Sequence, residues 1–251
     1  PIGGGARRVY HVERGAGHLY FVAGTDSAPD TWSLWTVDLV TGAAVDFPPV
    51  TTPVNFDGFP GFLEFDPVND RILGIVSRLT DNRRFLARFD PVTGDMTLIG
   101  TGFTTGGYSS GISAFDAAHQ IFYLVANVFG GSDAALYRAN AATGAVIGSA
   151  TLNTAIPDLG LTPNFLAYDP VSAQVLAIVN LPPNKVLASI NPTTGALAAL
   201  SAPMAATGYS SGLSDFDEAT GIFYFAANEA TNMISTLFRV EADGTVLPSH
   251  A

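Results

Sequence analysis

Short apolar runs alternate with polar turns along this chain, and the whole pattern returns about every fifty residues. The second repeat shows the plan, with apolar runs at 62–66, 71–78, 84–90 and 95–100 between turns that contain Asp-Pro, Asn-Asp or Thr-Gly. Runs of this length between turn residues predict β-strands, and their close succession predicts an antiparallel meander. No window has the apolar spacing of an amphipathic helix.

Two landmarks recur in every repeat. An acidic residue ends the first run, at Glu13, Asp66, Asp116, Asp169 and Asp217. A glycine closes the last turn, at Gly42, Gly94, Gly144, Gly195 and Gly244. Because both landmarks advance together along the whole length, we expect one supersecondary unit in five copies.

A four-stranded meander cannot bury both of its faces alone, and radial repetition solves this by stacking each sheet on its neighbours. We therefore predict an all-β fold in one domain, a five-bladed β-propeller of four-stranded antiparallel meanders. Its blades are expected at 9–50, 61–104, 111–153, 164–204 and 212–251. A six-bladed propeller with one blade missing is the alternative, because repeats three and five resemble each other, as do repeats two and four. The first repeat, of the odd type, has no even-type partner.

The turn punctuation resembles that of extracellular β-propeller repeat proteins. The segments that carry the resemblance are Phe65-Asp-Pro67, Tyr168-Asp-Pro170, Asp90-Pro-Val-Thr-Gly94 and Asn191-Pro-Thr-Thr-Gly195. The resemblance extends over nearly the whole chain, and it implies a fold. It implies no particular activity, since propellers serve both binding and catalysis.

The charge pattern limits the class of partner. The formal charge is −11 and Lys185 is the only lysine, so the composition argues against binding to nucleic acid or to anionic membranes. Only 13% of residues are charged whereas 47% are hydrophobic, which predicts a largely uncharged surface. Such a surface suits a neutral glycan or a protein partner, including the other subunits of a larger assembly.

The chain contains no cysteine, so disulfides and thiolate metal sites are excluded. No apolar run reaches the roughly 18 residues of a transmembrane helix. The sequence starts at Pro1 without an apolar leader, and we expect an exported, mature protein. No cofactor is expected.

Acidic side chains at equivalent positions allow two interpretations. The five landmark acids could form a ring of oxygen ligands for calcium, or each could accept backbone N–H bonds within its own turn. The second interpretation is favoured. The same structural role is expected for the residues that precede the glycine turns, which are Asp38, Asp90, Asn140, Asn191 and Glu241.

A serine pattern typical of hydrolases also occurs. Gly107-Tyr-Ser-Ser-Gly111 places Ser109 as a nucleophile would be placed, but the pattern has meaning only at a strand-to-helix elbow. It also recurs at 208–212, and one active serine does not come in two copies. We expect no catalytic and no metal-binding residues. The rival hypothesis puts His11, Glu64 and Asp215 in the channel, where paired carboxylates could cleave a glycan or a lactone.

Loop geometry favours a different surface. In a meander blade, the loop that enters the first strand and the loop between the second and third strands lie at the same end. This end should gather uncharged hydroxyl, amide and aromatic groups from two repeats, namely Tyr108, Ser109, Ser110, Asn127, Tyr209, Ser210, Ser211 and Asn228. These groups suit a neutral polar ligand such as a sugar, or a protein partner. Alternatively, the serines and glycines only permit a tight crossing between blades.

The sequence thus predicts a non-catalytic recognition or assembly module that acts through its loops. Two alternatives stay open: a hydrolase acting on a glycan or lactone with Glu64 and Asp215, and a purely structural subunit of a larger complex.

Overall fold

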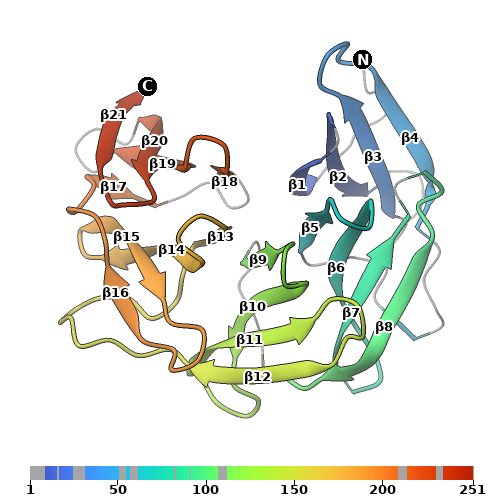
Figure 1. Cartoon of the computed structure of the whole chain (residues 1–251), viewed down its shortest axis with the longest axis horizontal. Coiled ribbons are helices and arrows are strands. Elements are labelled where there is room, and N and C mark those ends of the chain that lie inside the picture. Colours follow the sequence, from blue (N-terminus) through green and yellow to red (C-terminus); the bar gives the residue numbers. More distant parts are fainter. Residues whose placement is uncertain are drawn as a thin grey trace. The chain divides into compact units, whose positions relative to one another are not determined.

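The structure is a computed structural model, and it describes residues 9–15, 17–24, 32–50, 55–56, 62–81, 83–90, 92–106, 112–208, 214–229 and 234–250 (Figure 1). All named elements in these ranges are β-strands, which confirms the all-β class. In the same ranges, no helix has the length and apolar character that crossing a bilayer requires.

The strands form antiparallel meanders in chain order. The first sheet holds β1 (Val9–Gly15), β2 (His18–Gly24), β3 (Trp32–Asp38) and β4 (Ala44–Pro49). The second holds β5 (Leu63–Asp66), β6 (Arg71–Ser77), β7 (Arg84–Phe89) and β8 (Met96–Phe103). The third holds β9 (Ser113–Asp116), β10 (Ile121–Asn127), β11 (Ala134–Asn140) and β12 (Val146–Thr151).

The fourth sheet holds β13 (Phe165–Asp169), β14 (Gln174–Leu181), β15 (Asn184–Ile190) and β16 (Leu197–Ala199). The fifth holds β18 (Ser214–Asp217), β19 (Ile222–Glu229), β20 (Ser235–Glu241) and β21 (Val246–His250). It gains a short strand that the sequence did not predict, β17 (Ala206–Thr207), which pairs with β19 ahead of β18. Within the described ranges, the strands thus form five sheets, each containing a four-stranded meander.

The chain divides into two compact units. One comprises residues 1–105, 117–121 and 139–146, and the other comprises residues 106–116, 122–138 and 147–251. The first unit thus contains the first two sheets, and the second contains the last two. The third sheet contributes residues to both.

Burial explains why the second strand of a repeat reads as a continuous apolar run. Five consecutive residues are buried in each of β6, β10 and β14, so both faces of these strands are covered. In β19 burial alternates, because only one face meets the core that it shares with the fourth sheet.

Aromatic rings pack between neighbouring sheets in the same way in each unit. Tyr20 stacks on Phe65 in the first unit, with ring centroids 5.8 Å apart. Tyr123 stacks on Tyr168 in the second unit, at 5.9 Å. Both pairs join an odd repeat to the even repeat that follows it. This agreement supports the duplication of a two-repeat block.

The glycine landmark is explained by contact between sheets. Gly144, Gly195 and Gly244 adopt left-handed φ angles of 67°, 73° and 97°. A Cβ atom on any of them would clash with a backbone carbonyl oxygen of the preceding sheet, that of Ile99, Thr151 or Leu200 respectively. Glycine is therefore required twice over, for its φ angle and for the close approach of two backbones.

Gly42 provides a matched control for this explanation. Its φ angle is 69°, close to that of Gly144, but a Cβ atom on Gly42 would meet no described atom within 4 Å. We expect Gly42→Ala to lower the free energy of unfolding by about 1 kcal/mol, from φ strain alone. Gly144→Ala should lower it by about 1–3 kcal/mol more, because the backbones must separate. Urea unfolding measures both, and equal losses would contradict the explanation.

Candidate functional site

Each sheet has a hairpin end, which we define as the end where its second strand turns into its third. In the second unit, the segment that enters a sheet is bonded to this end. Gly106 N–H donates to the carbonyl of Asn127 at 2.8 Å, and Gly160 N–H donates to that of Asn180 at 2.7 Å. In the fifth sheet, Thr207 pairs with Asn228 through β17. An asparagine thus stands where the entering segment meets each hairpin.

The first unit has the same arrangement with different residues. In the second sheet, Leu79 N–H donates to the carbonyl of Asn55 at 2.8 Å, and Phe56 forms a β-bridge with Arg78. Ser77 ends the second strand there, at the position that asparagine has in the later sheets. The entry segment therefore lies beside the hairpin in four of the five repeats, as the loop geometry predicted.

Most of the predicted site residues lie outside the described part of the chain, namely Tyr108, Ser109, Ser110, Tyr209, Ser210 and Ser211. Their role stays a prediction. The described residues next to them are informative, because Gly106 and Thr207 each precede their tyrosine by two positions. Both are held at an asparagine, Asn127 or Asn228, which are the two predicted residues that the structure describes.

Asn127 and Asn228 differ in what their side chains meet across the hairpin. Ser235, opposite Asn228, donates its hydroxyl to Asn228 Oδ1 at 3.2 Å. The equivalent residue in the third sheet is Ala134, which has no polar group to offer. Tyr137 instead reaches the main-chain carbonyl of Asn127, at 3.5 Å. Both asparagines are half-buried.

In the fourth sheet, the residue that pairs with the hairpin asparagine, Asn180, is a cation, Lys185. The sequence analysis did not single out this lysine as a site. Lys185 is buried, with 2% of its surface exposed. Its Nζ donates to Asn180 Oδ1 at 2.7 Å and to Asn164 Oδ1 at 2.8 Å. Burial lowers the pKa of this ammonium group to about 8. When the repeats are aligned, Lys185 occupies the position of Arg84, Ala134 and Ser235. An alignment of the repeats could therefore have drawn attention to this lysine.

Three of the five landmark acids organise turns, as favoured from the sequence. Asp66, Asp169 and Asp217 each accept N–H bonds from residues two or three positions later in the turn. Four residues of the second set do the same, namely Asp38, Asp90, Asn140 and Asn191. The last member of the set, Glu241, departs from this pattern. In its turn, the side chain of Asp243 accepts the N–H bond, from Thr245. Among the described residues, no three His, Asp or Glu side chains are grouped so as to hold a metal ion.

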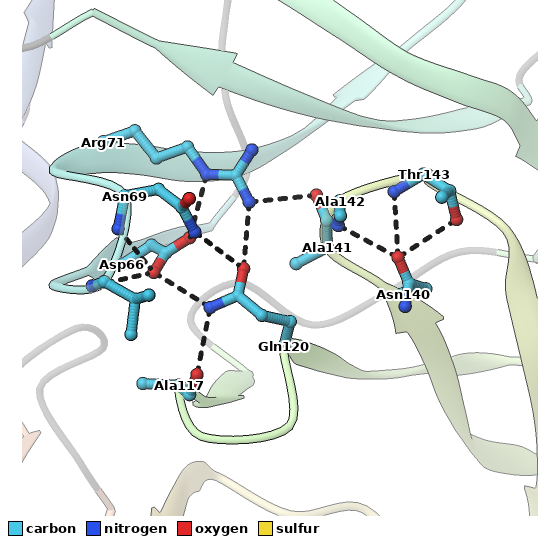
Figure 2. Close-up of polar contacts among 10 residues, drawn as sticks. Asp66, Asn69, Arg71, Ala117, Gln120, Asn140, Ala141, Ala142 and Thr143 are labelled. Atoms are coloured by element: carbon cyan, nitrogen blue, oxygen red, sulfur yellow. Dashed lines mark hydrogen bonds and ion pairs between the residues drawn. The ribbon is translucent and has the colours of Figure 1, made fainter.

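Asp66 itself is buried, and it is also the centre of a partly buried network that the sequence did not reveal (Figure 2). It accepts hydrogen bonds from Asn69 Nδ2 at 2.8 Å, Arg71 Nε at 2.9 Å and Gln120 Nε2 at 3.0 Å. Arg71 continues to Gln120 Oε1 at 3.1 Å and to the carbonyl of Ala141 at 3.2 Å. Burial alone would raise the pKa of Asp66, but the hydrogen bonds from Gln120, Asn69 and Arg71 outweigh it and lower that pKa.

Asp116 occupies the same position in its repeat as Asp66, but it accepts a hydrogen bond from a different type of residue. It is buried, and Tyr168 donates its hydroxyl to the Asp116 carboxylate. Burial of the ring, followed by this hydrogen bond, raises the pKa of Tyr168 well above its usual value. The first landmark thus bonds to the following sheet through a different partner in each unit, Gln120 in one and Tyr168 in the other.

Two of the three residues of the rival hydrolase hypothesis have described side chains. Glu64 lies half-buried on β5, in the first unit, and Asp215 lies exposed on β18, in the second. The side chain of His11 is outside the described residues.

Comparison with known proteins identifies the fold. No protein-family model and no curated protein matches the sequence. Among solved structures, TolB from Acinetobacter baumannii is similar with a TM-score of 0.62 and 14% identity, over 95% of this chain and 53% of that one. The β-propeller domain of the trilobed protease from Pyrococcus furiosus is similar with a TM-score of 0.54 and 10% identity, over 95% of this chain and 70% of that one. The fold is a β-propeller.

A chain of the nidogen/laminin complex is similar to this propeller as well, with a TM-score of 0.56 and 14% identity, over 98% of this chain and 80% of that one. This chain spans about half the length of the TolB chain. At these identities the likeness concerns the fold alone.

The buried ammonium group of Lys185 predicts a pH dependence. The unfolded chain keeps this proton up to about pH 10.5, whereas the folded protein releases it above about pH 8. Between these values the unfolded state binds more protons, so the free energy of unfolding should rise with pH, by about 3 kcal/mol. The buried tyrosines, whose pKa values are raised, act in the opposite direction above pH 10. The readout is therefore the difference between wild type and Lys185→Met, in urea unfolding from pH 7 to 10. Parallel curves would show that Lys185 is not the cause.

The network around Asp66 predicts a stability loss. Asp66→Asn removes the charge that faces the largely buried Arg71, and we expect it to cost about 3 kcal/mol at pH 7. Because the pKa of Asp66 is lowered on folding, its contribution is present above pH 4 and is lost as the pH falls below that value. The deficit of Asp66→Asn should therefore shrink in acid. The matched control is the exposed Asp90→Asn, expected to cost under about 0.5 kcal/mol. A deficit constant down to pH 2 would refute the assignment.

Proposed function

We propose that the chain is a single five-bladed propeller and a non-catalytic recognition module. It binds a protein partner, or a neutral polar ligand such as a glycan, through the loops at the hairpin ends of its third and fifth sheets. The proposal includes export from the cytoplasm, on the strength of the extracellular type of turn punctuation. The binding residues are those predicted from the sequence, Asn127, Asn228 and the two Tyr-Ser-Ser segments that begin at Tyr108 and Tyr209.

One observation carries this proposal. The Gly-Tyr-Ser-Ser-Gly segment occurs twice, and each copy begins directly after a residue that is bonded to an asparagine at a hairpin end. Repetition of an uncharged polar loop beside an uncharged amide suits hydrogen bonding to neutral groups rather than acid–base chemistry. The chain of the nidogen/laminin complex provides a structural neighbour that comes from a protein–protein complex.

Close packing supports a loop position fixed at its base. A Cβ atom on Gly106 would lie 3.0 Å from the Cβ of Asn127 and from the carbonyl oxygen of Val128. A Cβ atom on Gly208 would lie 3.4 Å from Nδ2 of Asn228. A loop that starts from a fixed point loses less conformational entropy on binding than a loop that is free at both ends.

The test uses Tyr108→Ala/Tyr209→Ala, combined with Asn127→Ala. The immobilised protein is exposed to an extract of its source organism and, in parallel, to an array of neutral glycans. We expect the triple variant to lose at least about tenfold in capture of whatever the wild type retains, because the aromatic and amide contacts are removed. Its melting temperature should stay within a few degrees.

The matched control carries Val171→Ala and Thr193→Ala, two exposed residues in turns of the fourth sheet opposite its hairpin end. These substitutions should leave capture unchanged. Undiminished capture by the triple variant, or equal loss in the control, would remove the loops from the binding site.

A further inference from the structure

The second sheet has a hollow at its turn end, which is the end opposite its hairpin end. The hollow has a volume of about 500 Å³, in the range of small-molecule sites. Its lining is mostly polar and includes Asp70, Arg71, Arg88, Asp90, Asp95 and Thr97. All of these residues belong to the first unit. The loops of the proposed function lie at hairpin ends, so an inference drawn from this hollow goes beyond that function.

Strand register explains why these side chains meet. Arg88 on β7 lies directly opposite Thr97 on β8. Two residues further toward the turn, Asp90 N–H donates to the carbonyl of Asp95 at 3.0 Å. Because side chains alternate between the two faces of a strand, these four residues share one face of the sheet. The hollow thus gathers groups of both charges on a single face.

Arg88 offers an unoccupied guanidinium group. It is exposed, and within the described part of the chain it forms no hydrogen bond or ion pair. Its counterpart in the fifth sheet, Arg239, donates Nε and Nη2 to the carbonyl of Pro248, at 3.1 and 2.7 Å. The other cation of the hollow, Arg71, is paired with Asp66 at 2.9 Å. Arg88 is therefore the cation whose two-pronged edge is open to a carboxylate.

Asp95 is the acid that distinguishes this turn from its counterparts. The residue after the landmark glycine is alanine in the first, third and fourth repeats and threonine in the fifth. The turn therefore forms without a carboxylate at this position. Among the described residues, nothing donates a hydrogen bond to the exposed Asp95 side chain. An acid that the turn does not need is available to a ligand.

Arg88 and Asp95 are diagonal neighbours across the two strands, a relation that separates residues by about 7 Å. They form no ion pair with each other in the described part of the chain. A ligand that carries both a carboxylate and an ammonium group can therefore bridge them. Its carboxylate would accept from the guanidinium group, and its ammonium group would donate to the carboxylate.

The charges of the lining define the ligand further. Three carboxylates, those of Asp70, Asp90 and Asp95, line the hollow against the single unpaired guanidinium group of Arg88. Such a lining favours a ligand with more ammonium than carboxylate groups. A bare metal ion is disfavoured, since no three His, Asp or Glu side chains of the described residues are grouped to hold one.

We propose that this hollow binds a dibasic amino acid such as lysine. The α-carboxylate accepts two N–H groups from Arg88, and the two ammonium groups donate to Asp95 and to the neighbouring carboxylates. A neutral sugar would leave the opposite charges of Arg88 and Asp95 without charged partners.

The probes are L-lysine, its methyl ester and L-norleucine, measured by isothermal titration calorimetry at low salt, where charges are least screened. The ester lacks the charged carboxylate, and norleucine lacks the side-chain ammonium group. The wild type should bind L-lysine at least about tenfold more tightly than either analogue, because each analogue loses one charge-assisted contact.

Two variants assign these contacts to residues. Arg88→Gln should weaken L-lysine about tenfold and abolish its advantage over the methyl ester. Asp95→Ala should weaken L-lysine by a similar factor and reduce its advantage over norleucine. Alanine stands at this position in three other repeats, so the turn should be retained. The matched control is Asp158→Asn, which removes a charge from an exposed position in the second unit and should change affinity less than about twofold.

The proposal is overturned if the wild type does not bind L-lysine at millimolar concentration, or if either analogue binds equally well. It is also overturned if Arg88→Gln or Asp95→Ala leaves the affinity unchanged, or if Asp158→Asn weakens binding as much as they do. Tighter binding of maltose would overturn it in favour of a neutral glycan. Because the loop variants and these variants share neither residues nor probes, the loop proposal and this one can fail separately.

Discussion

The close approach of a glycine to a carbonyl oxygen of the preceding sheet is the constraint on which the repeat depends. At Gly144, Gly195 and Gly244 two backbones meet with no room for a side chain. At Gly144 and Gly195 the turn is fixed by an asparagine side chain, Asn140 or Asn191, which accepts two backbone N–H groups. With the turn fixed, the sheets can stack and cover the central strands on both faces. The most regular part of the sequence is therefore the part that joins one sheet to the next.

This explains how much of the fold could be predicted from the sequence. Strand positions, the meander order and the structural role of the turn acids all follow from local rules, namely strand propensity, turn chemistry and side-chain capping. These rules act over a few residues and leave a periodic trace. Strand β17 escaped prediction because it is two residues long and forms only through its pairing with Asn228 and Glu229.

The contacts of the candidate site could be predicted less well from the sequence, for a physical reason. Gln120 reaches Asp66 across more than fifty residues of chain, and nothing in the local sequence of either residue indicates the contact. The burial of Lys185 is likewise invisible locally, since a single lysine reads as a surface residue until Asn164 and Asn180 are seen to accept from it. The concentration of arginines in residues 71–88 was hidden by averaging, because a strongly acidic total charge masks a short cationic segment. Of the predicted loop residues, Asn127 and Asn228 could be placed at the hairpin ends from strand order alone.

The third strand begins at Arg84, Ala134 or Ser235 in three sheets and has Lys185 as its second residue in the fourth sheet, while the turns at the other end keep nearly the same chemistry. Cohesion between sheets and the chemistry of the exposed hairpins thus reside at opposite ends of the same strands. A hairpin transplanted from one repeat into another would leave the glycine contacts untouched. The protein is for this reason a natural starting scaffold for engineering several different recognition surfaces into one chain.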